Sequence, residues 1–143
     1  MKLSEQIAAF RGKHFPDQLL GEVLCFLKDK KLYEVSEDRE FCMTYVIADD
    51  GERVWEGRWY DSSVEISMDS CLKLFHEVFP NWMWKVGTCS VSDDAWIAPM
   101  GLQEDRVLDT GFDVDSRPSR MNPCIAFLQA MCEAKEYLNE RHT

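Results

Sequence analysis

The sequence lacks the long apolar runs that mark membrane and secreted proteins. No stretch reaches the roughly 18 consecutive apolar residues of a transmembrane helix. The opening MKLSEQIAAFRGKHF holds only a short apolar patch, too short for the core of a signal peptide. We therefore expect a soluble, cytoplasmic protein.

The sequence also lacks the motifs of common catalytic and metal sites. Neither G-x-x-x-x-G-K-[ST] nor G-x-G-x-x-G occurs, and the 6 Cys include no C-x-x-C pair, so reduced thiols are expected. The three His, namely His14, His76 and His142, are scattered, which argues against zinc. Cys71 and His76 would lie about 140° apart around a helix, so they are not a nucleophile–base pair. These absences predict a non-enzymatic protein with no cofactor or metal.

Acidic residues outnumber basic ones, at 26 against 16, which gives a formal net charge of −10. Such a field repels nucleic acid and anionic lipid, so neither is an expected partner. It suits solubility, or docking onto a basic protein surface. Acidic residues at turns and loops, where solvation alone also explains them, are the candidates for partner binding: Asp49, Asp50, Glu52, Asp93, Asp94, Glu104 and Asp105.

Length and composition favour a single folded domain over residues 1–143. Apolar residues make up 45% of the chain and aromatic residues 12%, enough for a real core. The stretch 100–120 has no sustained periodicity and is rich in acids, so we expect a long loop that is functional or mobile, with a short strand at Gly111–Val114.

Capping residues and apolar periodicity predict the helices. Ser4 is the expected cap of a first helix that Gly12 ends, and Pro16–Asp17 opens a second one. Ser67 caps the clearest helix, which Pro80 stops. A last helix opens at Asn122–Pro123 and carries one apolar stripe.

A first hairpin is predicted from Phe41–Ile47 and Arg53–Tyr60, which an Asp-Gly turn joins. The polar segment Leu32–Glu40 before it is expected to be a connection. Alternation along the return strand assigns to its buried face Arg53, Trp55, Gly57 and Trp59.

A second hairpin is predicted within Asn81–Pro99, where apolar side chains alternate from Trp82 onward and Ser92–Asp94 forms the turn. The whole chain then forms an α+β fold, a mainly antiparallel sheet of two hairpins packed against three or four helices in a layered sandwich. Exposed hairpin edges favour a homodimer.

Trp is abundant for one small sheet, with 5 residues. Core filling explains Trp at alternating strand positions, but a surplus indole beside Arg or Lys would bind a planar anion such as a nucleotide. The candidate ligand-binding residues are Arg53, Trp55, Arg58, Trp59, Trp82, Trp84, Lys85 and Trp96.

From about residue 60 to 135 the chain resembles the phage α-β-α sandwich domain family. The resemblance lies in Tyr60–Val64, the Trp-rich Asn81–Gly87, the aromatic Ala95–Ile97 and the closing Pro123–Ala130. It implies a phage or prophage origin and a role in the infected cell, and it supplies no catalytic residues.

Two hypotheses of function follow. In the first, the protein inhibits or modulates a host protein, in the defence of the cell or elsewhere, through its acidic surface. In the second, it sequesters a nucleotide or cyclic-nucleotide-type signal in a Trp/Arg pocket. Both place it in the host-cell cytoplasm.

Overall fold

The computed structural model describes residues 1–11, 14–60, 63–120 and 122–141. The helices there are α1 (Leu3–Ala9), α2 (Asp17–Leu27), α3 (Met68–Val78), α4 (Arg106–Thr110) and α5 (Pro123–Arg141). The strands are β1 (Leu32–Asp38), β2 (Met43–Ala48), β3 (Arg53–Tyr60), β4 (Ser63–Val64), β5 (Trp82–Thr88), β6 (Asp93–Pro99) and β7 (Phe112–Ser116). Among these described residues, no helix is both long and apolar enough to cross a membrane.

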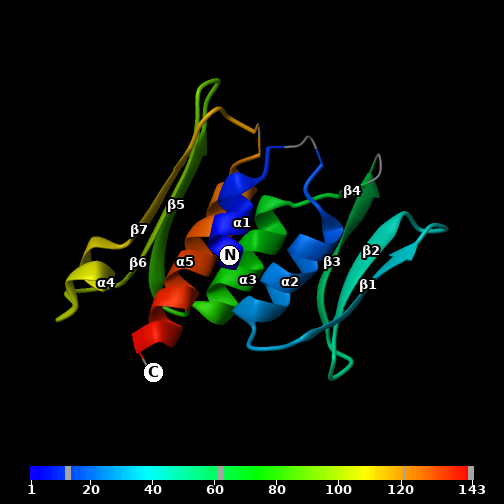
Figure 1. Cartoon of the computed structure of the whole chain (residues 1–143), viewed down its shortest axis with the longest axis horizontal. Helices are drawn as coiled ribbons and strands as arrows, with labels where there is room; N and C mark the ends of the chain where they lie inside the picture. The colour runs from blue at the N-terminus through cyan, green and yellow to red at the C-terminus, as the bar shows by residue number, and fades with distance from the viewer. Residues whose placement is uncertain (12–13, 61–62, 121, 142–143) are drawn as a thin grey trace.

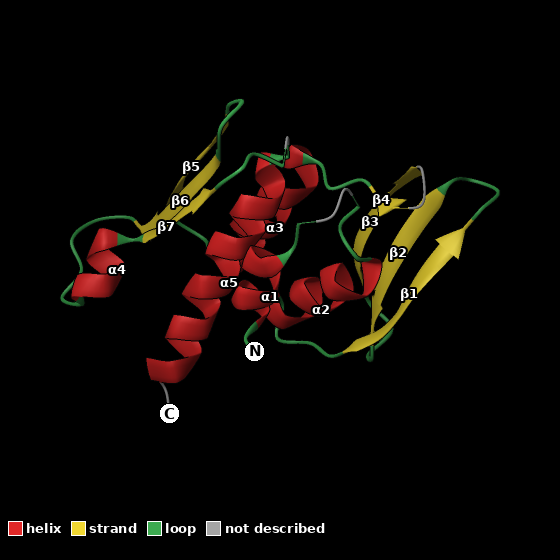
Figure 2. Cartoon of the chain, turned by 45° about the horizontal axis from the view of Figure 1, so that its top comes forward, coloured by secondary structure: helices red, strands yellow, loops and turns green. Residues whose placement is uncertain are grey.

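Helices α1, α2, α3 and α5 form a central layer between two antiparallel sheets (Figures 1 and 2). The first sheet has the order β1-β2-β3-β4 and the second the order β5-β6-β7. The predicted α+β class is confirmed. The two hairpins lie in different sheets, on opposite sides of the helices, rather than in one.

Helix α5 is the centre of the core. Its first half is buried on every side, because α1, α2, α3 and the second sheet all contact it. The Phe127 ring lies 5.3 Å from that of Phe75 on α3 and 6.0 Å from that of Trp84 on β5. The expected single stripe is therefore too narrow for this helix. Its start is as predicted, since Asn122 Oδ1 accepts a hydrogen bond from Cys124 N (3.0 Å).

The cap predicted for α3 is confirmed, and that for α1 is wrong. Ser67 Oγ accepts from Ser70 N (3.2 Å) at the start of α3. Helix α1 instead begins with Lys2 at its cap position, and the buried Ser4 hydroxyl donates to Glu136 Oε1 on α5 (2.5 Å). Gly12, the expected end of the helix, lies outside the described residues.

The segment expected to be a connection, Leu32–Glu40, contains strand β1. Leu32 and Val35 pack against the core beside α2, and pairing with β2 satisfies the backbone of an otherwise polar strand. Gly21 allows this close packing, since a Cβ there would lie 2.8 Å from Val35 Cγ2. Tertiary packing thus outweighs the low strand propensity of these residues.

The buried face predicted for β3 is partly wrong because of a β-bulge. Val46 pairs with Trp55, whereas Ile47 pairs with Arg53, so Val54 is the extra residue. Val54 and Trp55 are both buried, and Arg53 is exposed. The hairpin turn itself is as predicted, with Gly51 at a φ of 89°.

The second hairpin is confirmed, but its turn is misplaced in the prediction. Strand β6 already begins at Asp93, and the turn comprises residues 89–92. Asp93 is fully buried rather than at a solvated tip. The stretch 100–120 is also more ordered than a loop, because it contains α4 and β7, and β7 confirms the short strand expected there.

Candidate functional site

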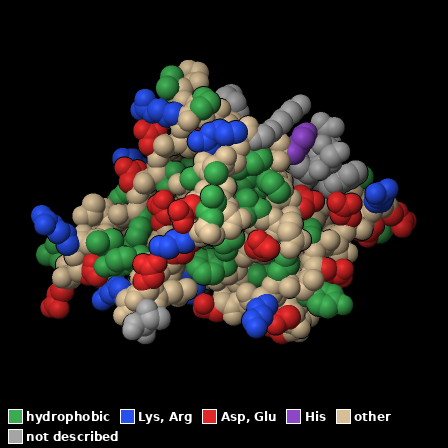
Figure 3. Space-filling view, in the orientation of Figure 1, with side chains coloured by type: hydrophobic (Ala, Val, Ile, Leu, Met, Phe, Trp, Pro, Cys, Tyr) green, Lys and Arg blue, Asp and Glu red, His purple; other side chains and the backbone are tan. Residues whose placement is uncertain are grey.

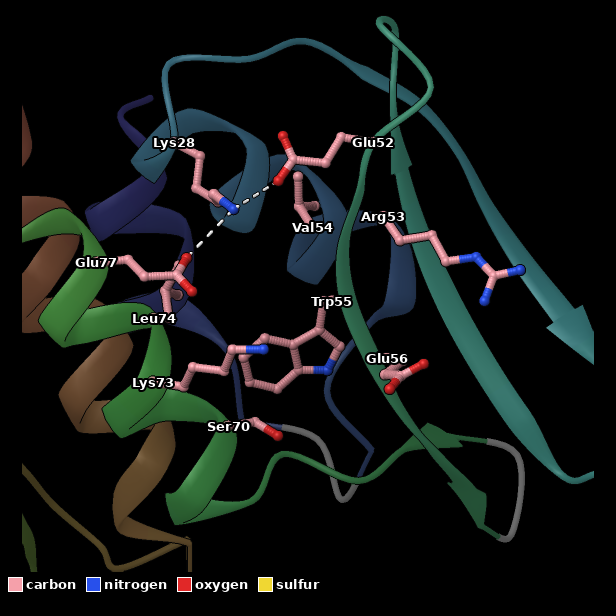
Figure 4. Close-up of a pocket in the computed structure, with 10 residues that line it drawn as sticks. All are labelled: Lys28, Glu52, Arg53, Val54, Trp55, Glu56, Ser70, Lys73, Leu74 and Glu77. Atoms are coloured by element: carbon pink, nitrogen blue, oxygen red, sulfur yellow. Dashed lines mark hydrogen bonds and ion pairs between the residues drawn. The ribbon is translucent and has the colours of Figure 1, made fainter.

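A cleft of about 420 Å³ lies between α2, β3 and α3. Figure 4 shows it with the first sheet on one side and α3 on the other. The lining residues are Lys28, Glu52, Arg53, Val54, Trp55, Glu56, Ser70, Lys73, Leu74 and Glu77.

Trp55 and Leu74 form the apolar floor of the cleft. Trp55 comes from the inner face of β3 and is 6% exposed, so it offers an edge rather than an open stacking face. Its buried Nε1 has no hydrogen-bond partner among the described residues, and the same is true of Thr44 Oγ1 on β2. A buried donor without a partner costs about 1–3 kcal/mol, so this part of the first sheet is less well satisfied than an ordinary core.

One end of the cleft is closed by an ion-pair network. The Lys28 amino group, at the end of α2, lies 3.0 Å from Glu52 Oε1 and 3.3 Å from Glu77 Oε2. Burial opposes the charge on Lys28, but its hydrogen bonds to Glu52 and Glu77 outweigh burial and raise the pKa of Lys28. The pKa of Glu52 is lowered by Lys30 first and by Lys28 second. Lys28 and Glu52 are therefore both charged at neutral pH.

The face of α3 that lines the cleft carries two further polar groups, Ser70 and Lys73. They are three residues apart, and Leu74 and Glu77 continue the same face at helical spacing. The Ser67 hydroxyl donates to Ser70 Oγ (3.0 Å), which leaves the Ser70 proton able to donate elsewhere. Lys73 is exposed and makes no ion pair with the part of the chain that the structure describes.

Of the ligand residues predicted on β3, Trp55 alone is seen to turn its side chain into the cleft. The Arg53 side chain points away (Figure 4), and its guanidinium lies 4.3 Å from the centroid of the Tyr45 ring on the outer face. Arg58 is exposed opposite Met43 on that same outer face. The prediction of an Arg beside this Trp is therefore wrong, because the bulge turns Arg53 outward. The side chain of Trp59 lies outside the described residues.

The remaining predicted ligand residues belong to the second sheet, on the other side of the helices. Trp82 packs on Phe79 with ring centroids 4.7 Å apart, and Trp84 stacks on Phe127. Trp82 is partly buried against the core, whereas Trp84 is 41% exposed despite its stacking contact. Lys85 and Trp96 lie on the opposite, outer face, so the predicted residues do not form one site.

The acidic residues predicted to bind a partner are also dispersed, and several are already engaged. Lys30 pairs with both Asp50 and Glu52. Asp105 Oδ1 accepts from Val107 N (2.9 Å) to cap α4, and its Oδ2 accepts from the Tyr137 hydroxyl (2.6 Å).

Asp93 is buried and accepts from Thr88 Oγ1 (2.6 Å), Ser119 Oγ (2.7 Å) and Arg120 N (2.7 Å). Asp49, Asp94 and Glu104 remain exposed. On the face seen in Figure 3, acidic side chains are interspersed with Lys and Arg rather than forming a field of one sign.

The sequence did not single out Lys28, Ser70, Lys73 or Glu77. The only signal was the spacing of polar residues beside the apolar face of α3, which is also typical of a solvated helix. Within the described residues, no group of three or more His, Cys, Asp and Glu side chains could hold a metal ion.

Comparison with known proteins gives no relative for this arrangement. No family model, no curated protein and no solved structure matches the chain.

Proposed function

We propose that the protein is a non-enzymatic binding protein that takes up a small anionic molecule in the cleft between β3 and α3. One observation carries the proposal: beside the apolar floor of Trp55 and Leu74, Ser70 offers a hydroxyl donor and Lys73 an exposed cation without an ion pair among the described residues. Such a combination binds phosphate or carboxylate groups that are attached to an apolar body.

The dimensions and walls of the cleft support this function. Its volume of about 420 Å³ falls within the range of small-molecule sites. Helices and a strand form its walls, and such elements hold a site more firmly than loops.

The two ends of the cleft suit different parts of one ligand. The anion would lie at Ser70 and Lys73, while Glu52 and Glu77 accept hydrogen bonds from amino or hydroxyl groups at the other end. A nucleotide or cyclic nucleotide has this chemistry, with a phosphate at one end and donors on its base. The resemblance to a phage domain family adds a role for such binding, the sequestration of a host signal.

The test is calorimetric titration and thermal unfolding with a panel of mononucleotides, cyclic nucleotides and ADP-ribose. We expect at least one ligand to raise the melting temperature in a concentration-dependent manner. Lys73→Ala should weaken its binding about tenfold. The matched control, Lys85→Ala, removes an exposed lysine from the second sheet and should leave the affinity unchanged.

Two results would refute the proposal. The first is no thermal shift with any member of the panel at millimolar concentration. The second is equal weakening by Lys73→Ala and Lys85→Ala, which would mean that the ligand responds to overall charge and not to the cleft.

A further inference from the structure

The second sheet has an outer face that the helical layer does not cover. Helix α5 lies against the inner face of β5, β6 and β7, and the short α4 lies at one end of the sheet (Figure 1). A groove of about 660 Å³ crosses the outer face. We call it the outer groove. It is lined by Lys85, Val86, Gly87, Asp94, Ala95, Trp96, Asp113 and Asp115.

Strand register places an indole among carboxylates in this groove. Trp96 on β6 is paired with Lys85 on β5 and with Asp113 on β7. In the next row on the same face, Asp94 is paired with Gly87 and Asp115. Side chains opposite one another in antiparallel strands lie about 5 Å apart, so these groups can meet one ligand. Gly87 leaves its corner open, because a Cβ there would touch nothing within 4 Å.

The indole of Trp96 is fixed in place. Its Nε1 donates to Thr110 O (3.1 Å) at the end of α4. Gly111 follows at a φ of 87°, and a Cβ there would lie 2.6 Å from the same Nε1. The ring therefore keeps its position against the sheet, which reduces the entropy lost when a partner binds.

The charges around the ring favour a cation. Asp94 and Asp113 are exposed and make no ion pair within the described part of the chain, whereas Asp115 is shared with Arg117 (3.2 Å). A guanidinium or ammonium group over an indole gains from the ring as well as from adjacent carboxylates.

We propose that the outer groove docks a basic segment of a partner protein, with an Arg or Lys side chain over Trp96 between Asp94 and Asp113. Charge complementarity selects this partner, since the groove is acidic and the whole chain has a net charge of −10. The groove and the cleft lie on opposite sides of the helical layer, so this proposal is independent of ligand binding in the cleft.

Lys85 makes one side of the outer groove positively charged, which limits the partner sequences that it can bind. It lies on the edge strand β5, across β6 from the carboxylate of Asp113. A partner that is basic throughout is repelled at Lys85, and one with an acidic or neutral residue at that point is not. Lys85→Ala should therefore strengthen the binding of an all-basic peptide about two- to threefold.

The test is the fluorescence anisotropy of a labelled peptide of alternating Arg and Ser. A labelled peptide of alternating Glu and Ser is the negative control and should not bind. We expect Asp94→Asn combined with Asp113→Asn to weaken binding about tenfold. The matched control, Glu34→Gln combined with Glu37→Gln, removes the same charge from exposed positions of β1 and should change affinity less than twofold. Peptide-induced amide shifts in an NMR spectrum should map to β5, β6 and β7.

Each alternative result overturns the proposal. Equal weakening by the two double variants would mean attraction by net charge alone. Displacement of the peptide by spermidine at equal concentration would make this a site for small cations. The last result is no binding of the Arg/Ser peptide at about 50 mM salt, where screening is weak. If circular dichroism shows that the protein is folded, this result means that the groove does not bind a basic segment.

Discussion

The first sheet (β1–β4) and the second sheet (β5–β7) flank the same helices but pack against them differently. In the second sheet, Trp82 and Trp84 contact Phe79 and Phe127, although Trp84 remains exposed. In the first sheet, α2 comes close through Gly21, but a cleft remains between β3 and α3. Trp55, which lines the cleft, is nevertheless only 6% exposed, whereas Trp84, which stacks on a helical ring, is 41% exposed. The burial of an indole therefore does not by itself show whether it lines a cleft.

The comparison predicts that the core beside the second sheet is the most sensitive to truncation. Phe127→Ala should destabilise the protein by about 3–5 kcal/mol, because Phe127 is fully buried between Phe75 and Trp84. Urea unfolding monitored by circular dichroism measures this. Phe41→Ala, which truncates an exposed ring beside the first sheet, should cost less than about 0.5 kcal/mol. Similar losses for both would contradict the description of α5 as the centre of the core.

Neighbouring aspartates at the start of β6 provide a second test. Asp93→Asn should cost about 2 kcal/mol, because the buried carboxylate accepts three hydrogen bonds that an amide cannot all accept. Asp94→Asn, on the outer face, should change stability little.

Acid should weaken the same contact. Burial acts to raise the pKa of Asp93, but hydrogen bonds from Thr88, Arg120 and Ser119 outweigh it and lower the pKa below its usual value. The lowered pKa adds stability above the unfolded pKa of about 3.9, and this is lost as pH falls through the folded pKa. Asp93→Asn should therefore flatten the fall of unfolding free energy below about pH 4. If Asp93→Asn leaves the pH dependence of the unfolding free energy unchanged, the hydrogen bonds of Asp93 do not contribute to acid destabilisation.

Removing the ion pairs at the closed end of the cleft should lower stability less than the truncation of Phe127 or the loss of the Asp93 carboxylate. Lys28→Met should destabilise the protein by about 1 kcal/mol, since it leaves the carboxylates of Glu52 and Glu77 together, the latter near the negative end of α3. Lys2→Met removes an exposed pair with Glu140 and should have little effect in the same denaturation experiment. If Lys28→Met is equally silent, the network does not stabilise the first sheet against the helices.

Each sheet has an exposed cysteine in a hairpin turn, Cys42 between β1 and β2 and Cys89 between β5 and β6, and their reactivities can be compared. Cys89 Sγ accepts from the backbone N–H groups of Val91 and Ser92 (both 3.4 Å), which lowers the pKa of this thiol. Cys42 Sγ instead donates to Arg39 O (3.7 Å). Iodoacetamide at neutral pH should therefore alkylate Cys89 several-fold faster, as peptide mass spectrometry can quantify. The Ser92 hydroxyl also lies 3.8 Å from Cys89 Sγ and contributes to the lowered pKa, so Ser92→Ala, which keeps the backbone N–H, should narrow the difference. Faster alkylation of Cys42 would show that the N–H groups of Val91 and Ser92 do not activate the Cys89 thiol.

The sequence determined the parts of this protein that depend on local chemistry. Ser67 and Asn122 marked helix starts because their side chains cap the next residues. Asp50–Gly51 marked the first turn because glycine adopts a positive φ easily. Alternating aromatic residues located β5, and the order of predicted helices and hairpins indicated an α+β fold.

Only the tertiary structure decided the features that depend on contacts between distant segments. Pairing with β2 made a strand of the polar β1, and the bulge at Val54 turned Arg53 away from Trp55. Asp93 is buried, and hydrogen bonds from Thr88 and Ser119 satisfy its carboxylate there. The cleft combines residues more than 40 positions apart, from Lys28 to Glu77. No local pattern encodes such a site, because its geometry depends on how closely a helix packs on a sheet.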